Sequence, residues 1–212
     1  TESNKKRNKI PFLYSYRRCP YAMRARMALV NSGIDFDIFE ISLKDKPKDM
    51  IDISPKGTVP ILVNGDQIID ESLDIMEWAY QSFDLNNHYS CLNVTQKKES
   101  YELININDSI FKFSLDKYKY SSNYKTESIE DLYQKCLFFI DRLEKKLSTS
   151  EFIITNNITF ADVAIFPFVR QFVNVNLERF LKGDYIKTIE WYQKMSAEEI
   201  FLSVMVKPNP KS

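Results

Sequence analysis

The chain has 212 residues, of which 44% are apolar and 27% are charged, so it can bury a core and is not disordered in bulk. Lysine plus arginine equals aspartate plus glutamate at 29 each, so bulk charge gives no argument for nucleic acid or an anionic membrane as a partner. No apolar run approaches the ~20 residues of a membrane span, and the first residues show no apolar signal region.

The cysteines and the single histidine narrow the chemistry. Cys19, Cys91 and Cys136 are odd in number and widely spaced, which does not resemble a secreted disulfide framework. We therefore expect the protein to be in the reducing cytosol. We expect Cys136 to pack in the core, and we assign no role to Cys91. His88 is the only histidine and lies in a polar stretch, so we expect neither a metal site nor a Cys–His dyad.

The first third of the chain alternates short strands and helices. An apolar strand is predicted at 11–16 and a helix at 21–32, which Gly33 ends as a C′ glycine does. Residues 34–38 alternate apolar and acidic side chains, which is strand periodicity. A strand, helix and strand in this order predict a right-handed parallel crossover.

A second group of elements follows in the first domain. Residues 43–53 predict a loop and a short helix, and 58–63 predict a strand with a proline near its start. Asn64-Gly65 is a strong two-residue hairpin signal, so 67–69 should return antiparallel. A helix then begins at Glu71-Ser72. The order β-α-β-(α)-β-β-α predicts a mixed four-stranded sheet with helices.

Beyond a polar linker at 82–93, strand signals vanish. We expect a flexible start at 1–9, a first domain at 10–81, an all-helical domain at 94–207 and a flexible tail at 208–212. The helical domain should begin with one long helix over 95–120. An amphipathic helix is predicted at 128–147 and a helix that is apolar nearly all round at 163–172. Two shorter helices, at 186–195 and 197–206, should end the domain. Thr159 to Asp162 has the form of a capping box before the most apolar of these helices.

Cys19 lies where the first strand ends and the first helix begins. Backbone N–H groups at a helix start lack internal partners and carry partial positive charge, so they stabilise a thiolate there. Pro20 suits the first helical position, and Arg17, Arg18 and Arg24 add positive charge nearby. We favour a nucleophilic cysteine over a buried structural one, which is how most unpaired cysteines behave.

The whole chain resembles a glutathione transferase, an α/β thioredoxin-like N-terminal domain followed by an all-α C-terminal helical bundle. Cys19-Pro20-Tyr21-Ala22 resembles the omega-class and glutaredoxin-like active site, and Leu43 to Pro47 resembles an omega-class loop whose second lysine contacts glutathione. Thr58-Val59-Pro60 resembles the strand start with a cis-proline, and Glu71-Ser72 resembles the pair that binds the γ-glutamyl end.

The resemblance implies which residues hold glutathione, and each has a simpler explanation. Tyr21, Lys46 and the Val59–Pro60 backbone would contact the tripeptide, the backbone as an added strand would. Glu71 would pair with the α-ammonium group and Ser72 would receive a carboxylate. An ordinary trans edge proline, a plain helix cap and a solvated lysine are the alternatives. The second substrate would lie between the domains near Phe111 or Tyr118.

The function implied is a cytosolic glutathione-dependent thiol transferase or reductase that forms a glutathione mixed disulfide on Cys19. Ala22 replaces the second cysteine of a Cys-x-x-Cys motif, so an external thiol must resolve that disulfide. Two alternatives stay open. One is a transferase that conjugates glutathione to electrophiles, using Tyr14, Ser15 or Tyr16. The other is a non-enzymatic partner-binding relative of stringent-starvation type. The family also suggests a homodimer, with no nucleic acid or membrane partner.

Overall fold

The computed structural model describes residues 10–123 and 127–206. The flexible ends expected at 1–9 and 208–212 lie outside these residues. The described residues form two compact units, the first of residues 10–83 with 204–206 and the second of residues 84–123 with 127–203.

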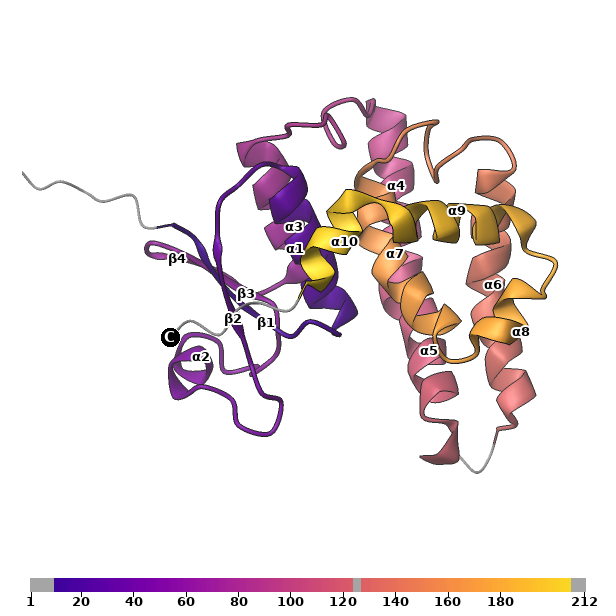
Figure 1. Ribbon diagram of the computed structural model, residues 1–212, viewed down its shortest axis with the longest axis horizontal. Helices are drawn as coiled ribbons and strands as arrows, with labels where there is room; N and C mark the ends of the chain where they lie inside the picture. The colour runs from indigo at the N-terminus through magenta and orange to yellow at the C-terminus, as the bar shows by residue number, and fades with distance from the viewer. Residues whose placement is uncertain (1–9, 124–126, 207–212) are drawn as a thin grey trace, which may run out of the picture. The chain divides into compact units, whose positions relative to one another are not determined.

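A four-stranded mixed sheet is the centre of the first unit. Its strands are β1 Phe12–Ser15, β2 Asp37–Glu40, β3 Ile61–Asn64 and β4 Gln67–Ile69, in the order β2-β1-β3-β4 (Figure 1). β1 runs parallel to β2, whereas β3 is antiparallel to both β1 and β4. The fold class and element order predicted from the sequence are therefore confirmed for this unit.

Helices cover both faces of this sheet. α1 (Pro20–Asn31) packs against α3 (Ser72–Ser82), and the short α2 (Lys48–Ile53) lies on the other face (Figure 1). Met50 of α2 forms a buried cluster with Ile41 and Ile61. Because side chains alternate along a strand, Ile61 and its neighbour Leu62 point to opposite faces, so both faces are buried.

The second strand begins later than its sequence pattern predicts. Alternation suggested 34–38, but β2 spans Asp37–Glu40. The end of α1 explains the difference, because the Gly33 N–H bonds to Val30 O at 3.0 Å and the Ile34 N–H to Leu29 O at 3.2 Å. These two bonds form a Schellman cap with Gly33 at φ 75°, so Ile34 belongs to the helix end.

The second unit is helical throughout its regular structure. Its α-helices, the last of which ends in the first unit, are α4 Val94–Ile106, α5 Lys112–Lys119, α6 Ile129–Leu147, α7 Phe160–Val173, α8 Leu177–Leu181, α9 Ile186–Ala197 and α10 Glu199–Met205. α7 is buried almost all round, as its composition predicts, and it contacts α4, α5 and α9. It forms the core of this unit, and it continues through Pro167.

The long helix expected over 95–120 is interrupted. A π-helical turn, Asn107–Phe111, separates α4 from α5, and a 3-10 turn follows at Ser121–Asn123. A π turn takes one more residue than an α turn and shifts the apolar stripe around the axis. Phe111 is fully buried at its end. Apolar spacing alone did not indicate this insertion.

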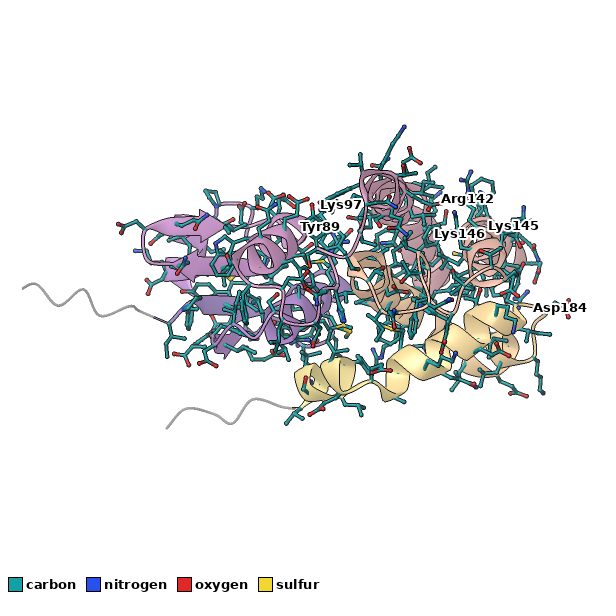
Figure 2. All side chains as sticks on the ribbon, turned by 90° about the horizontal axis from the view of Figure 1, so that it is seen from above. Tyr89, Lys97, Arg142, Lys145, Lys146 and Asp184 are labelled. Atoms are coloured by element: carbon teal, nitrogen blue, oxygen red, sulfur yellow. The ribbon has the colours of Figure 1, made fainter. Side chains whose placement is uncertain are left out.

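The segment that leads into the helical unit is fixed by hydrogen bonds. The Asp84 carboxylate accepts from the backbone N–H groups of His88, Tyr89 and Ser90 at 2.7–3.0 Å. The Tyr89 ring packs against Phe160. The Lys97 ammonium lies 4.2 Å from the centroid of the Tyr89 ring, and both residues are labelled in Figure 2. In the described part of the chain, no helix combines the length and apolarity needed to cross a membrane.

Candidate functional site

Cys19 is the N-cap residue of α1, directly after the turn that leaves β1. Its backbone is extended (φ −75°, ψ 122°), its N–H donates to Tyr16 O at 3.0 Å, and Pro20 takes the first helical position. The residue is half-exposed and its sulfur is a thiol. The predicted placement at a helix start is therefore confirmed. Cys19 lies at the N-terminus of α1, where the helix dipole places partial positive charge.

The loop before β3 lies next to this thiol. Cys19 Sγ is 3.8 Å from the carbonyl oxygen of Val59, and the Val59–Pro60 peptide is cis, as predicted. Lys46 is exposed, and its Nζ is 3.8 Å from the point where a side chain on Gly57 would begin. The structure thus brings Lys46 to the loop that carries Val59.

Ser72 begins α3, and a buried arginine from α1 supports it. Arg24 Nε donates to Ser72 Oγ at 3.0 Å, and both residues are buried. The guanidinium also lies 5.3 Å from the centroid of the Tyr21 ring. Because an arginine only donates, the Ser72 hydroxyl accepts this bond and keeps its own hydrogen for another acceptor. Arg24, expected to add charge near Cys19, thus contacts the γ-glutamyl side of the predicted site.

Glu71 is the N-cap of α3 and is exposed, with an ion pair that the sequence did not suggest. Lys56 Nζ lies 2.5 Å from Glu71 Oε1 and 3.3 Å from Asp70 Oδ1. The hydrogen bond to Glu71 raises the pKa of Lys56. One oxygen of the carboxylate predicted to bind an α-ammonium group therefore already faces a lysine.

The two aromatic residues expected near a second substrate are core residues of the helical unit. Phe111 is fully buried, with its ring centroid 4.8 Å from that of Phe139 and 5.9 Å from that of Phe172. Tyr118 is 4% exposed and packs on Tyr133 and Phe172. Neither side chain presents a surface to a ligand, so these positions carry packing.

Arg26 and Lys56 are the residues near the site that sequence reasoning missed. Arg26 is fully buried and contacts the turn before Cys19, and its spacing of seven residues from Cys19 was the available signal. Lys56 gave no local signal, because its partners Asp70 and Glu71 lie 14 and 15 residues away. Among residues 10–123 and 127–206, no three His, Cys, Asp or Glu side chains cluster as metal ligands.

Family models match both parts of the chain. The model described as "Glutathione S-transferase, N-terminal domain" matches residues 13–87, and "Glutathione S-transferase, C-terminal domain" matches 127–194. Fold and site thus define a class of proteins with two domains. The first is a thioredoxin-like sheet domain with a cysteine at the start of its first helix, and the second is helical. The chain belongs to the glutathione S-transferase family.

Individual relatives agree with this assignment. A probable glutathione transferase of Aplysia californica is 36% identical over 67 residues, which are 32% of this chain and 73% of that protein. Glutathione S-transferase omega-1 of Mus musculus is 35% identical over 72 residues, 34% of this chain but only 30% of its own length. A glutathione transferase family member from Pseudomonas fluorescens, solved with two glutathione molecules bound, superposes with a TM-score of 0.81. That match has 16% identity and covers 97% of this chain and 96% of the other.

Proposed function

We propose that the protein is a glutathione-dependent thiol transferase that reduces mixed disulfides through Cys19. The observation that carries the proposal is the half-exposed Cys19 thiol at the start of α1, beside the Val59 carbonyl. The same position in the chain matches the glutathione S-transferase N-terminal domain. A thiolate at a helix start attacks a disulfide sulfur more readily than an ordinary surface thiol does.

The reaction has two exchange steps. The Cys19 thiolate attacks the glutathionyl sulfur of a disulfide R–S–S–G, so the Cys19–glutathione bond forms while the original S–S bond breaks. The leaving R–S⁻ takes the bonding electron pair and then a proton. A second glutathione thiolate attacks the same glutathionyl sulfur, releases oxidised glutathione and returns the Cys19 thiolate. The net reaction converts R–S–S–G and one glutathione thiol into R–SH and oxidised glutathione, so one disulfide bond is exchanged for another and no further oxidant or reductant is needed.

The thiols of this chain support resolution by external glutathione. Ala22 is fully buried at the position where a Cys-x-x-Cys motif has its second cysteine. Cys136 is fully buried in the helical unit, and burial raises its pKa to about 12. Cys91 is exposed, but it lies in the segment that leads into the helical unit, and burial raises its pKa.

The route through a hydroxyl on β1 has less support. Tyr14 and Tyr16 pack against the cluster formed by Ile41, Met50 and Ile61. Ser15 is fully buried and accepts a hydrogen bond from Arg26 Nη1 at 3.2 Å. Ser15 therefore points into the unit, and the rings of Tyr14 and Tyr16 are partly buried against its core, so Cys19 at the start of α1 is the better candidate for the reacting group.

Glutathione would be held by backbone and side-chain groups of the first unit. The Val59 backbone would pair with the tripeptide, Lys46 would meet its glycine carboxylate, and Ser72 with the start of α3 would meet the γ-glutamyl carboxylate. Tyr21 and Glu71 would complete the γ-glutamyl side. We also propose a reducing, cytoplasmic location, which the odd number and wide spacing of the cysteines support. The family resemblance implies a homodimer, which a light-scattering measurement of molar mass would test.

The test is the reduction of the mixed disulfide between glutathione and 2-mercaptoethanol, measured as oxidised glutathione formed. We expect Cys19→Ser to lose this activity and Cys91→Ser, the matched control on an exposed thiol, to keep it. Full activity in Cys19→Ser overturns the cysteine mechanism. Conjugation of an aromatic halide by the wild-type protein, without disulfide reduction, identifies the conjugating alternative. Glutathione binding without turnover on either substrate identifies a partner-binding relative.

A further inference from the structure

α1 contains two arginines that are both almost completely buried. Arg24 is 2% exposed and Arg26 is 1% exposed. Arginine is rarely buried to this degree unless it is paired, because its charge loses hydration. Arg24 is accounted for by Ser72 and Tyr21, so Arg26 remains to be explained.

The position of Arg26 in the helix directs it back towards Cys19. Seven residues are about two helical turns, so the two residues lie on the same face of α1. Helical side chains tilt towards the N-terminus of their helix, so the long Arg26 side chain reaches back to the helix start. The residue that caps this start is Cys19.

The contacts of Arg26 fix the turn that precedes Cys19. Nη2 donates to the carbonyl oxygen of Arg17 at 2.7 Å, and Nη1 donates to Ser15 Oγ at 3.2 Å. Glu40, at the end of β2, completes the arrangement, because Oε1 accepts from the Arg17 N–H at 2.6 Å while Oε2 lies 3.9 Å from Arg26 Nη1. The turn from Ser15 to Arg17 is thus fixed from both sides.

Stability alone does not account for this arginine. Its Nε finds no hydrogen-bond partner among the described residues, and a buried donor without a partner destabilises the fold. Its ion-pair partner in the described part of the chain is Glu40, whose side chain is 31% exposed and lies 3.9 Å away, which makes a weak pair.

The charge of Arg26 persists at neutral pH. Burial lowers its pKa to about 10, while the charges of Glu40 and Cys19 oppose that change and the charge of Arg17 adds to it. Glu40 from β2, Arg17 from the turn and Cys19 from the helix start are therefore the charged or titratable groups that act on it. Arg26 remains a cation close enough to Cys19 for the two charges to interact.

We propose that Arg26 is a positioning residue for Cys19, which holds the turn before the thiol and stabilises the thiolate with a buried positive charge. The proposal rests on the proposed function, because it concerns the reactivity of the same sulfur. It assigns the activation of Cys19 to a residue inside the helix as well as to the helix start. The exposed Arg18, which directly precedes Cys19 in the sequence, is not required for this activation.

The test is the rate of iodoacetamide alkylation at Cys19 as a function of pH, with the peptide identified by mass spectrometry. In the wild-type protein we expect a midpoint below that of an ordinary cysteine, about 8.5. Arg26→Gln should raise the midpoint by about one pH unit and slow alkylation roughly tenfold at pH values below both midpoints. Arg26→Lys keeps the charge, so its midpoint should stay near wild type. Its turnover should fall, because a compact ammonium on a different side chain does not reproduce the planar fork whose two nitrogens bond to Ser15 Oγ and the Arg17 carbonyl oxygen.

Arg24→Gln is the matched control, since this arginine is equally buried in the same helix but bonds to Ser72. It should leave the alkylation midpoint in place and raise the KM for glutathione. A folded Arg26→Gln variant with the wild-type midpoint overturns the proposal. If Arg26→Gln does not fold, wild-type turnover in Arg26→Lys overturns it. Full disulfide-reducing activity in Cys19→Ser refutes the proposed function itself, whereas a wild-type midpoint in Arg26→Gln refutes only the role of Arg26, which separates the two failures.

Discussion

At the scale of single residues, Ser72 illustrates how a buried arginine can prepare a binding group. Arg24 Nε donates to the Ser72 hydroxyl at 3.0 Å, so the serine hydrogen is left to point elsewhere. The backbone N–H groups at the start of α3 add further donors. The serine and the helix start together form a small set of donors suited to a carboxylate.

We predict that Ser72→Ala weakens the binding of glutathione to the protein. A hydrogen bond to a charged group contributes about 1.5–3 kcal/mol, which corresponds to roughly a tenfold to hundredfold loss of affinity. Calorimetric titration with reduced glutathione measures the change. Ser82→Ala, at the exposed end of the same helix, is the control and should bind as the wild type does. Unchanged affinity in a folded Ser72→Ala variant would place the γ-glutamyl subsite elsewhere.

His88 should give the protein a pH-dependent stability. Burial lowers its pKa below the ordinary value of about 6.5, and the charge of Asp84 opposes this only in part. Below pH 6.5 the unfolded chain therefore binds more protons than the folded one, so the free energy of unfolding falls as pH falls. The slope from one group is at most about 1.4 kcal/mol per pH unit. Urea unfolding at pH 7.5 and 5.5 should show a smaller difference for His88→Gln than for the wild type.

At the scale of elements, the two helices α6 and α7 begin with the same device in different surroundings. Ser128 caps α6 and exchanges hydrogen bonds with the exposed Asp131. Thr159 caps α7 and bonds to Asp162, which is fully buried and also accepts from the Ile153 N–H at 3.0 Å and Trp191 Nε1 at 2.9 Å. The buried cap therefore ties three segments together as well as ending a helix.

We predict that Asp162→Asn destabilises the protein far more than Asp131→Asn. The asparagine at 162 would place amide hydrogens against donors and lose hydrogen bonds to a buried charge, at a cost of about 3 kcal/mol. The exposed pair at α6 contributes about 0.5 kcal/mol or less. Chemical denaturation of both variants measures the difference. Equal losses would show that burial of the cap does not determine its contribution.

At the scale of the whole molecule, the three thiols report on different states of the chain. Cys19 is half-exposed, Cys91 is exposed and Cys136 is fully buried, with a pKa raised to about 12 by burial. We predict that a maleimide labels Cys19 and Cys91 in the native protein and Cys136 only as denaturant unfolds α6. Peptide mapping identifies the labelled sites, and Cys91 serves as the internal control. Labelling of Cys136 without denaturant would contradict the observed packing.

The sequence by itself determined the features that depend on neighbouring residues. The strand-to-helix step at Cys19, the Asn64-Gly65 hairpin and the Thr159 cap all follow from short-range hydrogen bonding and backbone preference. These sufficed for the element order and for the resemblance to the family. They also placed the cysteine that the proposed chemistry requires.

Only the tertiary structure decided which distant groups meet. Arg24 and Ser72 are 48 residues apart, and Arg26 reaches Ser15 and Glu40 on two different strands. Phe111 and Tyr118 are aromatic residues on helices, and nothing in their local pattern distinguishes a ligand surface from the packed core they occupy. Partners of this kind depend on how the helices and strands pack, because buried side chains are assigned by shape and by the need to satisfy polar groups across the whole unit.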